Sequence, residues 1–398
     1  MIRRLTIRRS GWHQFPVPTP VIYRMVVALC LMVTSGCTGS AQAPRAHPSL
    51  ASPWASPLSP PATFTERGVT VERAAVRWSD LGTQPDTHAN GIGAEAGRRY
   101  VARTDAKDNQ LTVVRLRSDN RQMTTYRQAK PGYVTAHIFF VGDVAAILSE
   151  DSDLSDTVKG PGIADRVDLK TGQTIPLAGT SIAPPVADFA YQSAISGRTL
   201  YYSSLRDGKQ HTCVAAVDVI TGQGRLVHCA PPGWIVEFIR PGQDGATWLE
   251  VQGEAFDNCR VGRSVDASGT IAYVGPSAAC TTFDTASLSD WQVWSAFPMK
   301  SEDFIESNLY AQNNGQIQPL GYVKTGSVRQ CGGWVYWITN YPTGKPEQLR
   351  RWQPGSAVQM LLQNDADTVS ITAPACPDGE TVSVRLGDGN KDKVLALD

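Results

Sequence analysis

The chain has 398 residues, of which 41% are hydrophobic, and this is enough for a large buried core. Its 37 basic and 37 acidic residues cancel, so no net positive field would attract nucleic acid, and we expect no nucleic-acid partner. Charged residues make up only 19% of the chain, while Gly (35) and Pro (26) are plentiful, which is typical of short strands joined by many turns.

The first 36 residues have the order of a secretory signal. Several arginines precede the apolar run 25–33, which is too short to cross a bilayer. The small residues Ser35 and Gly36 then precede Cys37, and this stretch resembles the lipobox of bacterial lipoproteins. The resemblance implies cleavage after residue 36 and acylation of Cys37, with palmitate-type chains that hold the protein on the outer face of the cell membrane. Thr34 stands where the lipobox usually has leucine, so a plain secretory cut or an uncleaved anchor is the alternative.

Residues 37–68 follow as a predicted tether. They are rich in Pro, Ser and Ala and show no hydrophobic period, which is typical of an extended, semi-rigid linker. A tether directly after a lipidated cysteine would hold a folded domain, residues 69–398, off the membrane surface.

Hairpin-like segments recur in the remainder of the chain. Residues 166–177 and 216–227 each contain two strand-like runs joined by a Thr-Gly turn. Six such turns are centred on Asn120, Gly172, Gly222, Gly269, Gly315 and Gly355. Their separations of 52, 50, 47, 46 and 40 residues match the length of a four-stranded propeller blade.

The two ends of the domain complement each other. The last run, 392–398, is a third strand without a fourth, and residues 69–79 are a strand without a blade. The sequence therefore predicts an all-β fold, a seven-bladed β-propeller in which the N-terminal strand closes the last blade. By signal, tether and repeat, the chain resembles bacterial lipoproteins with TolB-type or WD40-type propellers. Two stacked β-sandwiches are the alternative.

Six cysteines remain after Cys30 and Cys37, an even number in an exported chain. Cys213 and Cys229 flank the turn at Gly222, and Cys259 and Cys280 flank the turn at Gly269. Each pair is therefore predicted to link neighbouring strands of one blade. Cys331 and Cys376 lie 45 residues apart, about one repeat, and are predicted to join adjacent blades. Zinc is the competing interpretation, but no C-x-x-C occurs and no histidine stands at ligand spacing.

The sequence holds no nucleophile elbow, no zinc-protease motif and no phosphate-binding loop, so catalysis has no direct support. We expect no cofactor. Asp388, Asn390 and Asp392 have the alternate spacing of a calcium loop, although the glycine and the distal glutamate of that loop are missing. This loop is the predicted metal site if Ca²⁺ binds, and a solvated hairpin loop is the alternative.

Loops between blades offer the best candidates for ligand contacts, because ligand sites favour concave places. The candidate binding residues are Trp234, Phe238, Arg240, Asp188 and Tyr191. Packing between blades is the alternative for the two aromatic residues Trp234 and Phe238.

Propellers of the kind that the chain resembles usually serve as rigid platforms. The sequence therefore predicts a monomeric, noncatalytic scaffold that binds an envelope protein or a peptide. A propeller enzyme acting on sugars or lactones is the first alternative. A carbohydrate-binding or cell-wall-binding module is the second, and the fold alone cannot choose among the three.

Overall fold

The computed structural model describes residues 63–66, 68–83, 87–95, 98–105, 113–118, 121–127, 130–151, 161–187, 192–206, 209–253, 258–277, 280–296, 307–339, 346–364, 370–387 and 392–397. The predicted signal, Cys37 and nearly all of the predicted tether lie outside these residues, so their predictions stay predictions.

Strands dominate the described part of the chain, and they form seven sheets. The first three sheets in chain order have four strands each, paired in the order β4-β5-β6-β7, β8-β9-β10-β11 and β12-β13-β14-β15. Their bounds are β4 (Thr87–Glu95), β5 (Arg98–Asp105), β6 (Val113–Ser118), β7 (Arg121–Arg127), β8 (Tyr133–Val141), β9 (Val144–Asp151), β10 (Ile163–Asp168), β11 (Thr174–Pro176), β12 (Ser193–Ser196), β13 (Thr199–Arg206), β14 (Lys209–Asp218) and β15 (Gly224–Cys229).

The next two sheets have the same meander, β16-β17-β18-β19 and β20-β21-β22-β23. Their bounds are β16 (Trp234–Gly242), β17 (Gly245–Gln252), β18 (Arg260–Val265), β19 (Ile271–Val274), β20 (Thr282–Leu288), β21 (Trp291–Ala296), β22 (Ser307–Asn313) and β23 (Gln316–Val323).

The last two sheets combine both ends of the domain, in the orders β1-β2-β27-β26-β25-β24 and β28-β29-β30-β3. Their bounds are β1 (Thr63–Glu66), β2 (Val69–Arg73), β3 (Trp78–Thr83), β24 (Arg329–Cys331), β25 (Trp334–Ile338), β26 (Gln348–Trp352), β27 (Val358–Gln363), β28 (Ser370–Ile371), β29 (Ser383–Gly387) and β30 (Asp392–Leu397).

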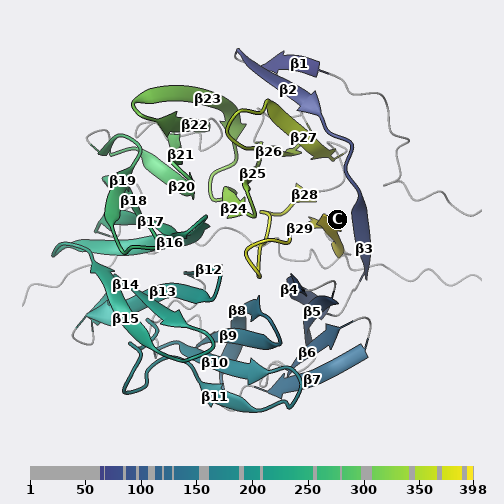
Figure 1. Ribbon diagram of the computed structural model, residues 1–398, viewed down its shortest axis with the longest axis vertical. Helices are drawn as coiled ribbons and strands as arrows, with labels where there is room; N and C mark the ends of the chain where they lie inside the picture. The colour runs from purple at the N-terminus through teal and green to yellow at the C-terminus, as the bar shows by residue number, and fades with distance from the viewer. Residues whose placement is uncertain are drawn as a thin grey trace, which may run out of the picture. The chain divides into compact units, whose positions relative to one another are not determined.

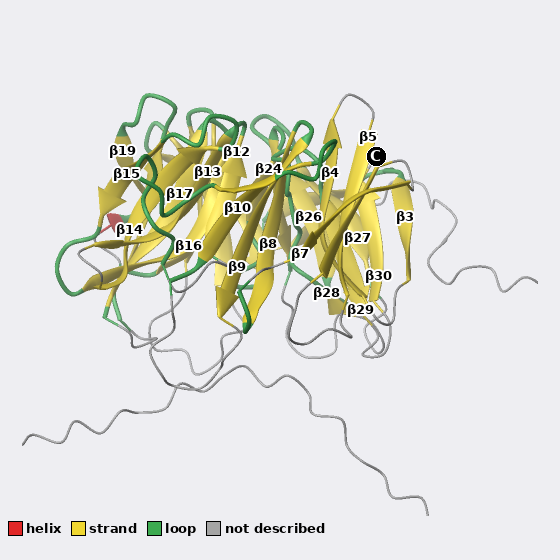
Figure 2. Ribbon diagram, turned by 90° about the horizontal axis from the view of Figure 1, so that it is seen from below, coloured by secondary structure: helices red, strands yellow, loops and turns green. Residues whose placement is uncertain are grey.

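The sheets stand around a common axis, with the first strand of each meander nearest the centre (Figure 1). Viewed from the side, the strands run from one face of a disc toward the other, and loops lie on both faces (Figure 2). This arrangement is a β-propeller, as the sequence predicted, and the sandwich alternative is wrong.

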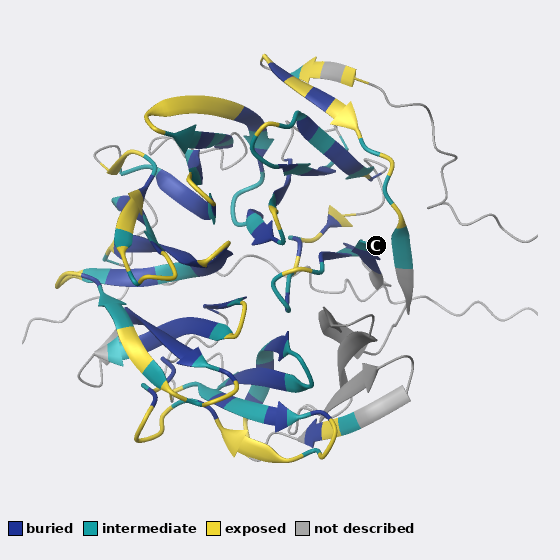
Figure 3. Ribbon diagram, in the orientation of Figure 1, coloured by how far each residue is buried: buried dark blue, intermediate teal, exposed yellow. Residues whose placement is uncertain are grey.

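The hydrophobic core lies between neighbouring sheets. Phe139 and Leu148 of the sheet β8–β11 pack with Ile195 and Leu200 of the sheet β12–β15. Burial of each such side chain stabilises the fold by roughly 1.5–3 kcal/mol. Inner strands are covered on both faces, and β17 is accordingly buried at every position but the last. The outer strand β11 and the first half of β23 are exposed, and the outer strand β15 is partly exposed (Figure 3).

The predicted hairpins around Gly172 and Gly222 are present and have one design. In the second, Asp218 Oδ1 accepts hydrogen bonds from the backbone N–H groups of Ile220 and Thr221, at 2.9 and 2.8 Å. Gly222 then adopts a φ of +74°, which L side chains rarely reach. Asp168 and Gly172 repeat the arrangement. These backbone hydrogen bonds lower the pKa of the Asp168 carboxyl, and the turn is fixed by local sequence alone.

The closing strand differs from the prediction in its extent. We expected residues 69–79 to form one strand in the last sheet, but the chain crosses between two sheets at Ala74–Arg77. Trp78–Thr83 (β3) pairs antiparallel with β30 and completes the last sheet. Val69–Arg73 (β2) pairs parallel with β27 of the sheet before it. Val71 is fully buried there, which explains why these residues join that sheet.

Three disulfide bonds form with the predicted pairing, and they indicate an oxidising, exported environment. Cys213 and Cys229 are cross-strand neighbours within one sheet, as predicted. Cys331 and Cys376 join adjacent sheets, also as predicted. The placement of the bond between Cys259 and Cys280 was wrong, because these residues precede β18 and β20 and therefore link two sheets.

Candidate functional site

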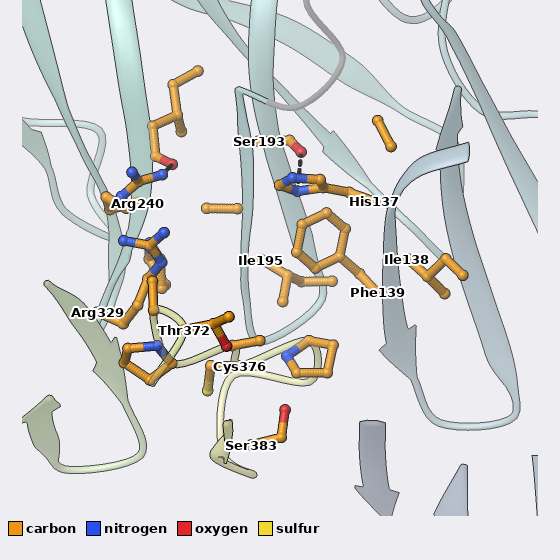
Figure 4. A pocket seen from close by; sticks show the side chains of 18 of the residues that line it. His137, Ile138, Phe139, Ser193, Ile195, Arg240, Arg329, Thr372, Cys376 and Ser383 are labelled. Atoms are coloured by element: carbon orange, nitrogen blue, oxygen red, sulfur yellow. Dashed lines mark hydrogen bonds between the residues drawn. The ribbon is translucent and has the colours of Figure 1, made fainter. Parts of the chain in front are cut away.

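A cavity of about 370 Å³ lies where inner strands meet near the axis. Strands β8, β12, β16 and β24 contribute to its wall, and residues 372–377 with β29 complete it. Its volume falls within the range of roughly 300–1,000 Å³ that is usual for sites binding small ligands. Figure 4 shows Arg240 and Arg329 on one side and His137 and Phe139 on the other, with Thr372 and Cys376 across one end.

β-Bulges shape this wall. The pairing register of β16 with β17 shifts between Glu237 and Arg240, and Phe238 within the bulge has a φ of +52°. In β8 the register with β9 shifts between Thr135 and His137. A bulge inserts an extra residue and re-aims the side chains that follow it. Arg240 and His137 each come directly after a bulge, and both line the cavity.

Phe238 occupies a backbone conformation that is rare for an aromatic residue and therefore stores strain. Its ring packs against Phe283 of β20, with centroids 5.3 Å apart. The Arg240 guanidinium carbon lies 5.3 Å from the Phe238 ring centroid, a cation–π contact. The bulge thus positions the arginine through its own aromatic residue.

Arg240 is the most buried cation of the cavity, with 9% of its surface exposed. Its one hydrogen bond is a long one of 3.4 Å, from Nη1 to the carbonyl oxygen of Ile239, and its Nε has no partner among the described residues. Burial lowers the pKa of Arg240 to about 10, while Asp284 opposes the shift. Arg240 therefore remains protonated at neutral pH.

Arg329, half-buried at the start of β24, lines the same wall. Its Nη1 donates to the carbonyl oxygens of Gly326 and Val328, at 2.9 and 2.7 Å. Burial and the positive charge of Arg240 hold the pKa of Arg329 well below its usual range. The two cations are close enough to repel each other.

Asp284 of β20 is the counter-charge behind the two arginines and is 1% exposed. Its Oδ2 accepts hydrogen bonds from the N–H of Gly326 at 2.9 Å and from Ser295 Oγ at 3.2 Å. Burial raises the pKa of Asp284, and Arg240 and Arg329 counteract the shift. Within the described part of the chain, neither arginine forms a salt bridge with it within 4.0 Å.

His137 and Ser193 form the polar pair opposite the arginines. Ser193 Oγ lies 3.2 Å from His137 Nδ1, within hydrogen-bond distance (Figure 4). Burial, with the positive charges of Arg240 and Arg329, lowers the pKa of His137 to about 4. The imidazole is therefore neutral at neutral pH.

The rest of the lining is mostly apolar. Phe139, Ile195, Ile239 and Pro377 contribute, and so do several alanines. The described lining residues include three arginines, the third being Arg385, and no acidic residue. The cavity thus combines a cationic wall with an apolar one.

Trp234, Phe238 and Arg240 were predicted to lie in a loop between blades, but they belong to strand β16, so this part of the prediction was wrong. Arg240 lines the cavity and Phe238 supports it from the bulge. Trp234 is half-buried against the core between two sheets and does not line the cavity. Asp188 and Tyr191 lie outside the described residues, as do Asp388, Asn390 and the side chain of Asp392. Among the described residues, no group of three or more His, Cys, Asp or Glu could hold a metal ion.

His137, Ser193 and Arg329 were missed as site residues. They occur in the first strands of three different sheets, and no short motif connects them. The available signal in the sequence was their position in the first strand of a repeat, because the first strands of a propeller lie nearest its axis. The bulges that orient Arg240 and His137 could not be predicted from the pattern of turns in the sequence.

Solved structures resemble this fold at low sequence identity. A prolyl endopeptidase matches 78% of this chain and 50% of its own, with a TM-score of 0.52 and 9% identity. The β-propeller domain of the Trilobed protease from Pyrococcus furiosus matches 79% of this chain and 93% of its own, with a TM-score of 0.51 and 10% identity. This chain thus spans half the length of the first. Such low identities show a shared β-propeller fold alone.

No protein family and no curated protein matches the sequence. Among the described residues, no helix has the length and apolarity that crossing a membrane requires.

Proposed function

We propose that this protein is a noncatalytic binding scaffold of the cell envelope, which holds part of a peptide or protein partner in its central cavity. The observation that carries the proposal is the cavity itself, whose lining combines mostly apolar side chains with buried Arg240. Among the described residues, Arg240 makes a single long hydrogen bond. Ligand sites combine such apolar walls with a few oriented polar groups. The strained bulge at Phe238 also fits a site kept for binding rather than for stability.

A lipid anchor at Cys37 would keep this scaffold at the membrane surface. The Cys37→Ser variant should then move the protein from the membrane fraction to the soluble fraction, with loss of acyl mass from its N-terminus. An unchanged membrane fraction would favour an uncleaved anchor instead.

We also propose that the six-stranded sheet is one blade of the propeller. Strands β24–β27 form a meander like the other six, and β1 and β2 extend its outer edge. With this sheet the propeller has seven blades, the number expected from the repeat. An experimental structure viewed down the axis tests the count.

A photo-cross-linking residue at the cavity tests the function. Ala375 is exposed and lines the cavity, and Ala267 is an exposed alanine in the turn between β18 and β19. We expect p-benzoylphenylalanine at Ala375, in the full chain in its native envelope, to capture one reproducible partner that the same residue at Ala267 does not capture. Equal capture from both positions, or none from either, would remove the proposal.

The hydrogen bond between Ser193 and His137 favours the enzyme alternative, because a hydroxyl beside an imidazole is an arrangement for nucleophilic catalysis. Against it, an imidazole with a pKa of about 4 is a weak general base at neutral pH. A fluorophosphonate probe distinguishes the two: covalent labelling of Ser193, abolished in Ser193→Ala, would replace the scaffold proposal with a hydrolase acting on esters or lactones.

A further inference from the structure

The side chains that line the cavity also indicate the chemistry of the group that it binds. We propose that Arg240 and Arg329 bind a carboxylate of the ligand, whose apolar body packs against Phe139, Ile195 and Pro377. This inference rests on the proposed function, because it names the ligand class of the same site.

Buried Arg240 is the first argument. A buried cation is normally paired, because the loss of its hydration is costly. Arg240 is 9% exposed, yet among the described residues its Nε has no partner and its Nη1 has a single long hydrogen bond. Nε is itself buried, so the N–H groups that remain for a ligand are those at the tip of the guanidinium, which lines the cavity and is supported from behind by Phe238.

The neighbouring arginine is the second argument. The guanidinium groups of Arg240 and Arg329 lie on the same wall and repel each other, which destabilises the folded protein. An anion bound between them would remove that repulsion. Asp284 offsets only part of the charge, because it is one carboxyl group facing two arginines and does not line the cavity. An anionic ligand therefore supplies the charge that the described part of the site lacks.

The shape and polarity of the site favour a carboxylate over a phosphate. The planar guanidinium fork matches the oxygens of a carboxylate and of a phosphate alike, so the apolar wall decides between the two. Isolated phosphate would leave the apolar wall of Phe139, Ile195 and Pro377 uncovered, whereas a carboxylic acid with an apolar body would fill it. Such a group has two sources, the C-terminus of a peptide and a free small acid, and the chemistry of recognition is the same for both.

Isothermal titration of the full-length, oxidised protein tests the inference with paired probes. The first pair is 3-phenylpropionate and 3-phenylpropionamide. The second is a tetrapeptide pool with free C-termini and the same pool with C-terminal amides. Inorganic phosphate is the fifth probe. We expect at least one carboxylate to bind ten-fold or more tightly than its amide, and more tightly than phosphate. The pair that responds identifies the source.

Lysine substitutions locate the binding group while they keep the positive charge. We expect Arg240→Lys and Arg329→Lys each to weaken carboxylate binding ten-fold or more, since lysine cannot form the bidentate contact. The control is Arg198→Lys on the surface, where Arg198 pairs with Asp218. It should bind like the unmodified protein. Circular dichroism spectra and melting temperatures establish that the three variants are folded.

The outcomes separate this inference from the proposed function. If amides bind as tightly as acids, if phosphate binds more tightly, or if the two cavity variants bind normally, the carboxylate assignment is wrong. The carboxylate assignment is also wrong if no probe binds at 10 mM although the cross-linker at Ala375 still captures a partner. In that case the scaffold proposal stands. Carboxylate binding lost in both cavity variants, without any captured partner, would support the assignment and remove the peptide or protein partner.

Discussion

Two buried arginines of this protein have opposite surroundings. Arg350 of β26 is fully buried, and its guanidinium donates to Glu66 Oε2 at 2.5 Å and to Gln348 Oε1 at 2.7 and 3.0 Å. Arg240 of β16 is almost as deeply buried, and among the described residues it has one weak hydrogen bond, to a backbone oxygen. The first is held by side chains of its own sheet, and the second faces a cavity.

The difference separates a structural cation from a binding one. Arg350 fastens the β1–β2 hairpin to the sheet through Glu66, and removing it would take away the guanidinium of this ion pair. Arg240 has no salt bridge to lose among the described residues, so its burial weakens the fold unless a ligand compensates. Natural binding sites often carry such a cost in stability.

The largest expected effect comes from the disulfides, of which one contributes to the cavity lining and another does not. Replacing both Cys331 and Cys376 by Ser should cost about 4 kcal/mol of unfolding free energy, and replacing Cys213 and Cys229 about 3 kcal/mol, because the first bond closes the longer loop. Denaturant unfolding under oxidising conditions measures both. Only the first pair should also weaken ligand binding, since Cys376 lines the cavity. Equal effects on binding would contradict this.

The Arg350→Met substitution should follow in size. It leaves Glu66 without its guanidinium partner beside a buried sheet, and breaking a buried pair typically costs about 3–5 kcal/mol. Glu66 is partly exposed, so we expect about 3 kcal/mol. Urea unfolding gives the value. The double variant Arg350→Met and Glu66→Gln is the control and should recover part of the loss. A single variant as stable as the unmodified protein would show that the pair does not fasten the hairpin.

The third effect is a pH dependence from His137. Its folded pKa of about 4 lies below the ordinary value of 6.5, so the unfolded chain binds a proton that the folded protein excludes. Stability should therefore be constant above this range and fall as the pH drops from 6.5 towards 4. The full shift corresponds to about 3 kcal/mol, and because His137 as a residue is only half-buried we expect about 2 kcal/mol. His137→Gln should lose most of this slope in unfolding experiments, whereas an unchanged slope would assign it to other groups.

The smallest effect on stability is expected for Arg240→Met, which sharpens the contrast with Arg350 most directly. Removing a buried cation without a salt bridge relieves desolvation and repulsion, so unfolding free energy should change by less than about 1 kcal/mol, in either direction. Binding should nevertheless be lost. A destabilisation as large as that of Arg350→Met would make Arg240 a structural residue.

Much of the architecture was predictable from local sequence because local chemistry determines it. The Asp-x-x-Thr-Gly turn at Asp218 fixes a hairpin by hydrogen bonds within five residues, and it recurs at Asp168. Cysteine spacing gave the three disulfide pairs, although spacing could not show that Cys259 and Cys280 join two sheets. The extent of the closing strand was wrong because two adjacent sheets compete for residues 69–79.

The candidate site was only partly predictable. Arg240 was identified from the composition of a segment predicted to be a loop, although that segment is strand β16. Arg329, His137 and Ser193 were not identified, because each comes from a different sheet. The bulges that expose Arg240 and His137 to the cavity depend on pairing with neighbouring strands. Phe238 has a positive φ without being glycine, so no local residue type signals it.

The sequence by itself determined the strands, the turns and the cysteine pairs, because each depends on residues near in the chain or on repeated spacing. Only the tertiary structure decided which side chains meet at the axis. A propeller brings the first strand of every repeat to the same place, and register shifts within those strands then select the residues that face the cavity. The arginine pair that we assign to a carboxylate is a product of that geometry.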